Sequence, residues 1–176
     1  LRVELDGSKK WRKRFALPMQ KSSDLKVFFR EIDGAYGNNH PRFRWTRILK
    51  AEEIKDAVDL FAIANVLPSN VKVLDRGASG RVLSLEIFAE EEQLRKVLKL
   101  DEIRRVLPNL PSTLFVVEQI KKGLWQFSGG GFGHGAGLSQ AGAIDLALKG
   151  WKASKILMHY YPGTKYGTLQ SLPKAP

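Results

Sequence analysis

The stretch Phe127-Ser-Gly-Gly-Gly-Phe-Gly-His-Gly-Ala-Gly-Leu-Ser-Gln140 is the feature around which the rest of the chain is arranged. Six of the sixteen glycines lie between Gly129 and Gly137, so the backbone here must make turns that residues with a Cβ atom resist. Two runs of apolar, β-branched or aromatic residues precede it, at 114–117 and 124–127, and such runs are typical of strands. This order predicts a strand that leads directly into a glycine-rich loop.

A helix is expected on the far side of this loop. Residues 141–148 are rich in good helix formers, and Ser139 stands where a helix N-cap would. The pattern of strand, loop and helix places His134, Ser139 and Gln140 on an exposed loop between rigid elements. Functional side chains are often found on such loops.

The composition is that of a globular chain without cysteine chemistry. Hydrophobic residues make up 43% of the 176 positions, and there is no cysteine, which excludes disulfides and thiolate metal sites. His40, His134 and His159 are too far apart in sequence for a compact metal motif, so we expect neither a metal nor a cofactor. A site with three ligands brought together by folding stays open.

The sequence at the ends of the chain does not indicate the cellular compartment of the protein. No apolar run approaches the roughly 18 residues that a membrane span needs, and nothing at the start resembles a signal peptide. Because the chain begins with leucine rather than methionine, we expect its native start to be missing. A membrane anchor upstream of Leu1 therefore stays open.

The chain is strongly basic. Lys and Arg number 29 against 18 Asp and Glu, which gives a net charge of +11. Such a charge favours polyanionic partners, namely nucleic acid, anionic lipid or an anionic cell-wall polymer. The alternative is a basic surface that is simply solvated.

Residues 1–39 differ from the rest and are expected to form an exposed, turn-rich arm. They contain the dense basic run Lys9–Arg14, with Trp11 inside it. Such a run could bind phosphates while the indole stacks on a base, but an exposed arm is the simpler interpretation. No chemistry is assigned to this segment.

Hydrophobic patterning predicts an α+β domain of mixed strands and short helices over residues 40–168, followed by a loose tail at 169–176. Besides the elements named above, we expect a strand at 42–49 and a helix at 50–64. A hairpin of two strands is expected at 71–76 and 80–87, and two further helices at 89–106 and 153–159.

The glycine-rich loop first suggests phosphate binding, but the context is wrong. Residues 131–136 satisfy the dinucleotide pattern G-x-G-x-x-[GA], yet no acidic residue lies near Trp151 to Met158 and no strand pattern follows. Residues 137–141 are similar to a nucleophile elbow. Asp145 and His159 would complete its triad, but they follow too closely for the usual sheet.

An uncharged, hydroxyl-rich ligand suits this loop better. Carbohydrate sites combine hydrogen-bonding groups with aromatic faces. The candidate faces are Trp125, Phe132, Tyr160 and Tyr161, although the two tyrosines could equally pack beneath the last helix. The candidate ligand-binding residues are His134, Gly135, Ser139, Gln140, Tyr160 and Tyr161.

These residues also carry a resemblance. Residues 131–143, with Gly150, Ile156-Leu157 and the run His159-Tyr-Tyr-Pro-Gly-Thr164, resemble the end of the SpoIID/LytB family of bacterial cell envelopes, the stage II sporulation D and amidase-enhancer proteins. Arg44-Trp45, residues 79–82 and residues 110–115 fit as well. The resemblance covers roughly His40 to Thr164, so the domain at 40–168 is expected to be the C-terminal part of a SpoIID-like domain.

The resemblance implies an extracytoplasmic peptidoglycan lytic transglycosylase. Such an enzyme cleaves between N-acetylmuramic acid and N-acetylglucosamine: one Glu protonates the glycosidic oxygen, then takes the C6 hydroxyl proton to close a 1,6-anhydro ring. The implied partners are peptidoglycan glycan strands and a cell-wall amidase, with no nucleic acid. The alternative is a non-catalytic glycan-binding or amidase-enhancing module.

The catalytic residue itself is not found. In the family it lies on a helix with a Glu-Met-Pro-like motif that precedes the matched region, and residues 1–39 do not match that helix. The cysteine metal ligands of some members have no counterpart. No family motif surrounds any of the candidate glutamates, which are Glu4, Glu31, Glu52, Glu53 and Glu86, so the catalytic role stays unassigned.

Overall fold

The computed structural model describes residues 6–165 and 167 and confirms an α+β fold. The elements follow in the order α1 (Lys9–Arg14), α2 (Ser22–Arg30), β1 (Arg44–Lys50), α3 (Ala51–Ala57), α4 (Asp59–Ala64), β2 (Asn70–Arg76), β3 (Val82–Ala89), β4 (Leu94–Lys99), α5 (Glu102–Val106), β5 (Phe115–Lys121), β6 (Leu124–Gly130), α6 (Gln140–Leu148) and α7 (Ala153–Tyr160).

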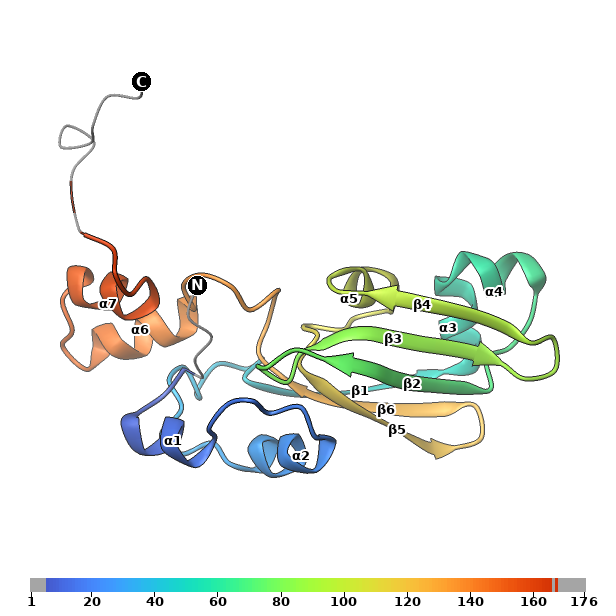
Figure 1. Ribbon diagram of the computed structural model, residues 1–176, viewed down its shortest axis with the longest axis horizontal. Coiled ribbons are helices and arrows are strands. Elements are labelled where there is room, and N and C mark those ends of the chain that lie inside the picture. Colours follow the sequence, from blue (N-terminus) through green and yellow to red (C-terminus); the bar gives the residue numbers. More distant parts are fainter. Residues whose placement is uncertain (1–5, 166, 168–176) are drawn as a thin grey trace, which may run out of the picture.

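The strands form two antiparallel sheets of three strands each, with orders β1-β6-β5 and β2-β3-β4 (Figure 1). In the first sheet Ser128 of β6 faces Thr46 on one side and Val116 on the other. The amide of Val82 donates to the carbonyl of Thr113 at 2.8 Å and so ties the second sheet to the segment that leads into the first.

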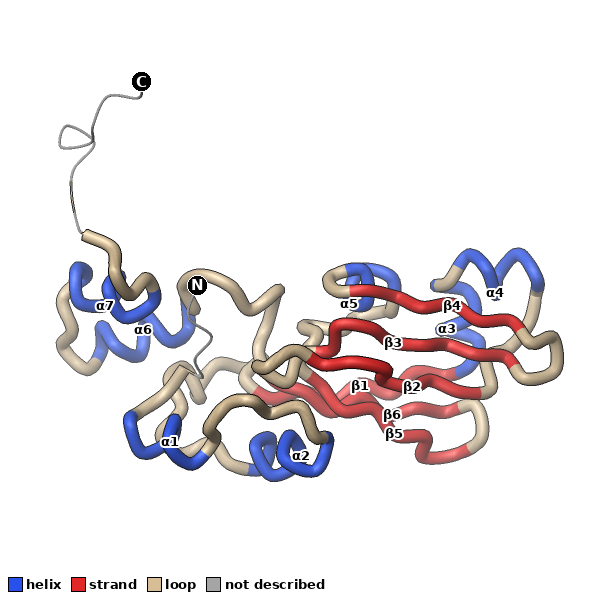
Figure 2. The backbone as a smooth tube through the Cα atoms, viewed as in Figure 1, coloured by secondary structure: helices blue, strands red, loops and turns tan. Residues whose placement is uncertain are grey.

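Both sheets share one hydrophobic core with α3, α4 and α5. Its largest fully buried side chains include Trp125, Phe61, Phe115 and Phe127. Figure 2 shows the strands gathered at one end of the molecule, whereas α6 and α7 lie at the other. The chain between β6 and α6 joins these two parts, so this arrangement depends on the glycine-rich loop.

Most expected elements are confirmed. The hairpin β2–β3, the strands β1, β5 and β6, and the helices α6 and α7 lie where the sequence predicts them. The expected helix over 50–64 is interrupted, because Val58 adopts an extended backbone with φ −115° and ψ 104° and divides it into α3 and α4.

The expected helix over 89–106 is wrong for most of its length. Residues 94–99 form β4, which pairs with β3, and only α5 is helical. Gln93 and Leu100 have φ of 53° and 49°, so left-handed turns flank the strand. Apolar residues at 94, 97 and 98 fit one helix face, but the free edge of β3 offers them a full set of backbone hydrogen bonds.

The expectation of an exposed N-terminal arm is also wrong. Ser8 caps α1, its hydroxyl accepting from the Trp11 amide at 3.2 Å. The Trp11 indole is only 4% exposed, because it packs on Phe15 and Phe28 with ring centroids 4.5 and 5.5 Å away. Lys9, Lys10, Lys13 and Arg14 are exposed, whereas Arg12 is half-buried, so α1 is an amphipathic helix of the domain.

The loose tail expected at 169–176 lies outside the described residues. Over the part of the chain that the structure describes, no helix has both the length and the apolar character needed to cross a membrane.

Candidate functional site

The glycine-rich loop runs from Gly131 to Ser139 and uses left-handed backbone at alternate positions. Gly131, Gly133, Gly135 and Gly137 have φ of 74°, 84°, 75° and 83°, a region in which a Cβ atom is strained. The loop ends at Ser139, whose hydroxyl accepts from the Gly142 amide at 3.1 Å and caps α6. The predicted order of strand, glycine-rich loop and helix is thus confirmed.

Hydrogen bonds from buried groups hold the start of the loop. The Trp45 indole donates to the carbonyl of Gly131 at 3.1 Å, and the Gly131 amide donates to the carbonyl of Phe43 at the same distance. Two residues further on, the Gly133 amide donates to the carbonyl of Pro111 at 2.9 Å. The first half of the loop is therefore fixed to the core of the domain.

This loop forms one wall of a cleft of about 630 Å³. The other walls come from the N-terminal segment, the chain around Phe43, the start of β3 and the end of α7. Five of the six candidate residues line the cleft, namely His134, Gly135, Ser139, Gln140 and Tyr160. Tyr161 is not among the lining residues.

The exposed side chains of the cleft are concentrated on the loop. Phe132 is 61% exposed, and the Arg42 guanidinium lies over its ring at 4.3 Å from the centroid. His134 is exposed too, and its Nδ1 accepts from the Ala136 amide at 3.1 Å, which orients the imidazole. Trp125, in contrast, is 1% exposed in the core, so its expected role as an aromatic face is wrong.

A second feature of the cleft is a cluster that sequence reasoning did not find. The Tyr160 hydroxyl donates to Asp6 Oδ2 at 2.8 Å, and His159 Nε2 lies 3.2 Å from Asp6 Oδ1. Burial, and then the charge of Asp6 and its hydrogen bond, raise the pKa of Tyr160 well above its usual range, so this phenol stays protonated and donates. No sequence signal joins residues so far apart in the chain.

The same N-terminal segment is joined to α6. The Gly37 amide donates to Asp145 Oδ2 at 3.3 Å, and the same oxygen accepts from Lys149 Nζ at 2.9 Å. A Cβ atom at Gly37 would lie 2.8 Å from the carbonyl carbon of Ala141, so only glycine allows this approach. The helices α6 and α7 are therefore positioned by residues from the opposite end of the chain.

The charges that line the cleft are mostly positive. Arg42, Arg44 and Arg81 are among its lining residues, whereas Asp6 is the one carboxylate in the described lining. The Arg81 guanidinium donates to the carbonyl of Gly133 at 3.2 Å. Burial, and then the nearby charge of Arg104, lower the pKa of Arg81 from its ordinary value.

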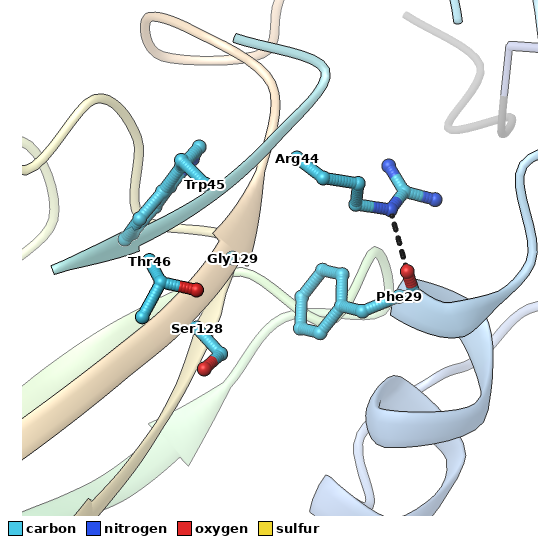
Figure 3. Close-up of a pocket in the computed structure, with 6 residues that line it drawn as sticks. All are labelled: Phe29, Arg44, Trp45, Thr46, Ser128 and Gly129. Atoms are coloured by element: carbon cyan, nitrogen blue, oxygen red, sulfur yellow. Dashed lines mark hydrogen bonds between the residues drawn. The ribbon is translucent and has the colours of Figure 1, made fainter.

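Arg44 lines both this cleft and a smaller cavity of about 270 Å³, whose lining residues are drawn in Figure 3. Its guanidinium donates to the carbonyls of Phe28, Phe29 and Glu31 at 3.1, 3.1 and 3.0 Å. These carbonyls lie at the C-terminal end of α2, where helix carbonyls lack partners within the helix. Arg44 thus satisfies the carbonyls at the C-terminal end of α2, whose C-cap residue is Glu31. Burial lowers the pKa of Arg44 to about 10, which leaves it charged at neutral pH.

We expect Arg44→Ala to lower the free energy of unfolding by about 2–3 kcal/mol, because it leaves the carbonyls at the end of α2 without their donor. Arg44→Lys should recover less than half of that loss, since an ammonium cannot present the planar fork of a guanidinium. Arg47→Ala is the matched control on the same strand: this side chain is exposed and should change stability by less than about 0.5 kcal/mol. Urea denaturation measures all three, and equal losses for Arg44→Ala and Arg47→Ala would contradict the assignment.

In the described residues, no group of three or more His, Cys, Asp or Glu side chains is placed to hold a metal ion. The structure thus defines a small basic α+β domain whose cleft is built on a glycine-rich loop. A family model described as a domain of unknown function, DUF8618, matches residues 1–137, and the chain belongs to this family. No curated protein matches the chain. The matched range includes α1, α2, both sheets and most of the loop, which agrees with the packing of the N-terminal segment into the domain.

Proposed function

We propose that this domain binds peptidoglycan glycan strands in the cleft at its glycine-rich loop. The observation that carries the proposal is that the loop with the SpoIID/LytB-like sequence forms a wall of a cleft of about 630 Å³. A cavity of that size falls in the range of ligand pockets. Hydroxyl and amide groups from Ser139, Gln140 and Tyr160 surround it, next to the exposed ring of Phe132. Sugar rings need this combination of polar groups and apolar faces.

Binding is better supported than cleavage by the residues that the structure describes. A lytic transglycosylase needs a carboxylic acid that can reach the glycosidic oxygen. Asp6 is the one carboxylate in the described lining, and its two oxygens contact Tyr160 and His159 of α7. Asp6 therefore holds α7 against the N-terminal segment, and the catalytic role stays unassigned. Glu4, an earlier candidate, lies outside the described residues.

The test combines a binding assay and a digest on purified peptidoglycan glycan strands. We expect the chain to sediment with the strands and to release no products with 1,6-anhydro ends by mass spectrometry. That result also fits the alternative of a non-catalytic, amidase-enhancing module. Anhydro products would instead show that an acid within this chain is sufficient, and Glu4→Gln and Asp6→Asn would then locate it.

Matched variants tie the binding to the cleft. Gln140→Ala combined with His134→Ala removes two exposed polar side chains of the loop wall. Each lost hydrogen bond contributes about 1 kcal/mol, so we expect about thirtyfold weaker binding. Gln119→Ala, at an exposed position in the second half of β5 and outside the lining, is the control and should bind like the wild type. Unchanged affinity of the double variant, with wild-type stability, would place the ligand elsewhere.

A further inference from the structure

Arg81 is a half-buried cation, and the described residues use little of its hydrogen-bonding capacity. Its guanidinium has five N–H donors, and within the described residues it makes one hydrogen bond, to the carbonyl of Gly133 at 3.2 Å. No carboxylate of the described chain forms an ion pair with it, and the charge that it senses most is the like charge of Arg104. Its other N–H groups are not among the buried atoms without a partner, so they reach the solvent of the cleft and are available to pair with an anion.

The half-buried Arg44 and the buried Arg76 show how the same chain satisfies the donors of such groups. Arg44 donates to four backbone carbonyls, and Arg76 donates to the carbonyls of Gly80 and Phe115, both at 2.8 Å. Each of these guanidinium groups is therefore satisfied by the fold alone. Arg81 differs from both, and unlike Arg76 it lines the cleft.

The loop is shaped to leave the Arg81 guanidinium in this position. A Cβ atom at Gly135 would overlap the Nε, Cζ and Nη2 atoms of Arg81, so the guanidinium lies directly against the backbone of the loop. Arg42 lies across the Phe132 ring on the same cleft, and the chain carries a net charge of +11. The surrounding potential therefore favours an anion at the guanidinium.

We infer that Arg81 is an anion-recognition point of the cleft and pairs with the carboxylate of an acidic sugar unit. The inference rests on the proposed function, and it makes Arg81 the residue by which the cleft distinguishes a carboxylate-bearing glycan from a neutral one. A guanidinium can hold a carboxylate through two parallel hydrogen bonds, which fixes the orientation of the sugar as well as its charge.

The test compares two tetrasaccharides by isothermal titration calorimetry. One is neutral and contains only N-acetylglucosamine, and the other alternates it with N-acetylmuramic acid, which adds carboxylates. We expect the wild type to bind the acidic tetrasaccharide about tenfold more tightly at low salt, and the preference to shrink as salt is raised. Arg81→Gln should lose the preference and keep the affinity for the neutral sugar. Arg47→Gln, an exposed arginine outside the lining, should keep both.

A second measurement does not depend on the variant folding or on glycan binding. D-lactate is titrated into the wild-type protein while the Arg81 side-chain Nε–H resonance is followed by NMR, with the Arg47 resonance as the control. A saturable shift at Arg81 alone supports the anion-recognition point. Equal affinity of the wild type for the two tetrasaccharides would overturn the inference and leave the proposed function standing. Binding of neither sugar would overturn the proposed function, and the lactate titration would then decide for or against the anion-recognition point by itself.

Discussion

Gly129→Ala is expected to lower the free energy of unfolding by about 3 kcal/mol or more, although it adds a single methyl group. Gly129 is buried in the central strand β6, with Trp45 opposite it in β1 and Phe115 opposite it in β5. A Cβ atom here would overlap the Trp45 ring and the carbonyl oxygen of Leu114. The ring is 8% exposed and the carbonyl belongs to the backbone, so neither can move away cheaply.

This substitution should also disturb the cleft. The Trp45 indole donates to the carbonyl of Gly131, and Figure 3 shows Trp45 of β1 next to its pairing partner Gly129 of β6. Moving the indole would release the start of the glycine-rich loop. We therefore expect weaker glycan binding even under conditions in which the variant is still folded.

Gly77→Ala is the matched control for Gly129→Ala. Neither glycine has a left-handed φ, so both substitutions add a Cβ atom without backbone strain. At Gly77 the nearest atom is 3.6 Å away, in the Leu83 side chain, which is an ordinary contact. Its stability should change by less than about 1 kcal/mol in thermal or urea denaturation. Similar losses at the two positions would show that Gly129 is not kept small by Trp45.

Trp11→Ala is expected to lower the free energy of unfolding by about 3–5 kcal/mol, the cost of removing a large buried aromatic side chain. Trp11 joins α1 to α2 through Phe15 and Phe28, and these residues form the second core cluster of the domain. Because Trp11 also lines the cleft, its loss should weaken ligand binding too.

The control for Trp11→Ala is Lys10→Ala, one residue away on the exposed side of α1. It should change stability by less than about 0.5 kcal/mol. Urea denaturation followed by far-UV circular dichroism and by fluorescence should give coincident transitions, because α1 and α2 unfold with the rest of the domain. An effect of Trp11→Ala as small as that of Lys10→Ala would restore the exposed arm that the sequence suggested.

Local sequence patterns were sufficient to predict an element wherever its own residues favour one type of secondary structure. The strands of the hairpin β2–β3 carry alternating apolar residues on either side of a turn, β5 opens with a run of apolar, β-branched and aromatic residues, and the cap at Ser139 marks the start of α6. Local patterns failed at β4, whose apolar residues fit a helix equally well. Pairing with the free edge of β3 made this segment a strand, and a short window of sequence contains no information about that edge.

The same division applies to the site. The sequence by itself determined the glycine-rich loop, because alternate left-handed positions require glycine, and it placed the cap and the exposed side chains of His134 and Gln140. Only the tertiary structure decided that Asp6 meets Tyr160 and that the Arg81 guanidinium lies against the backbone of Gly135. These contacts join residues far apart in the chain, and long-range packing, rather than local backbone preference, brings them together.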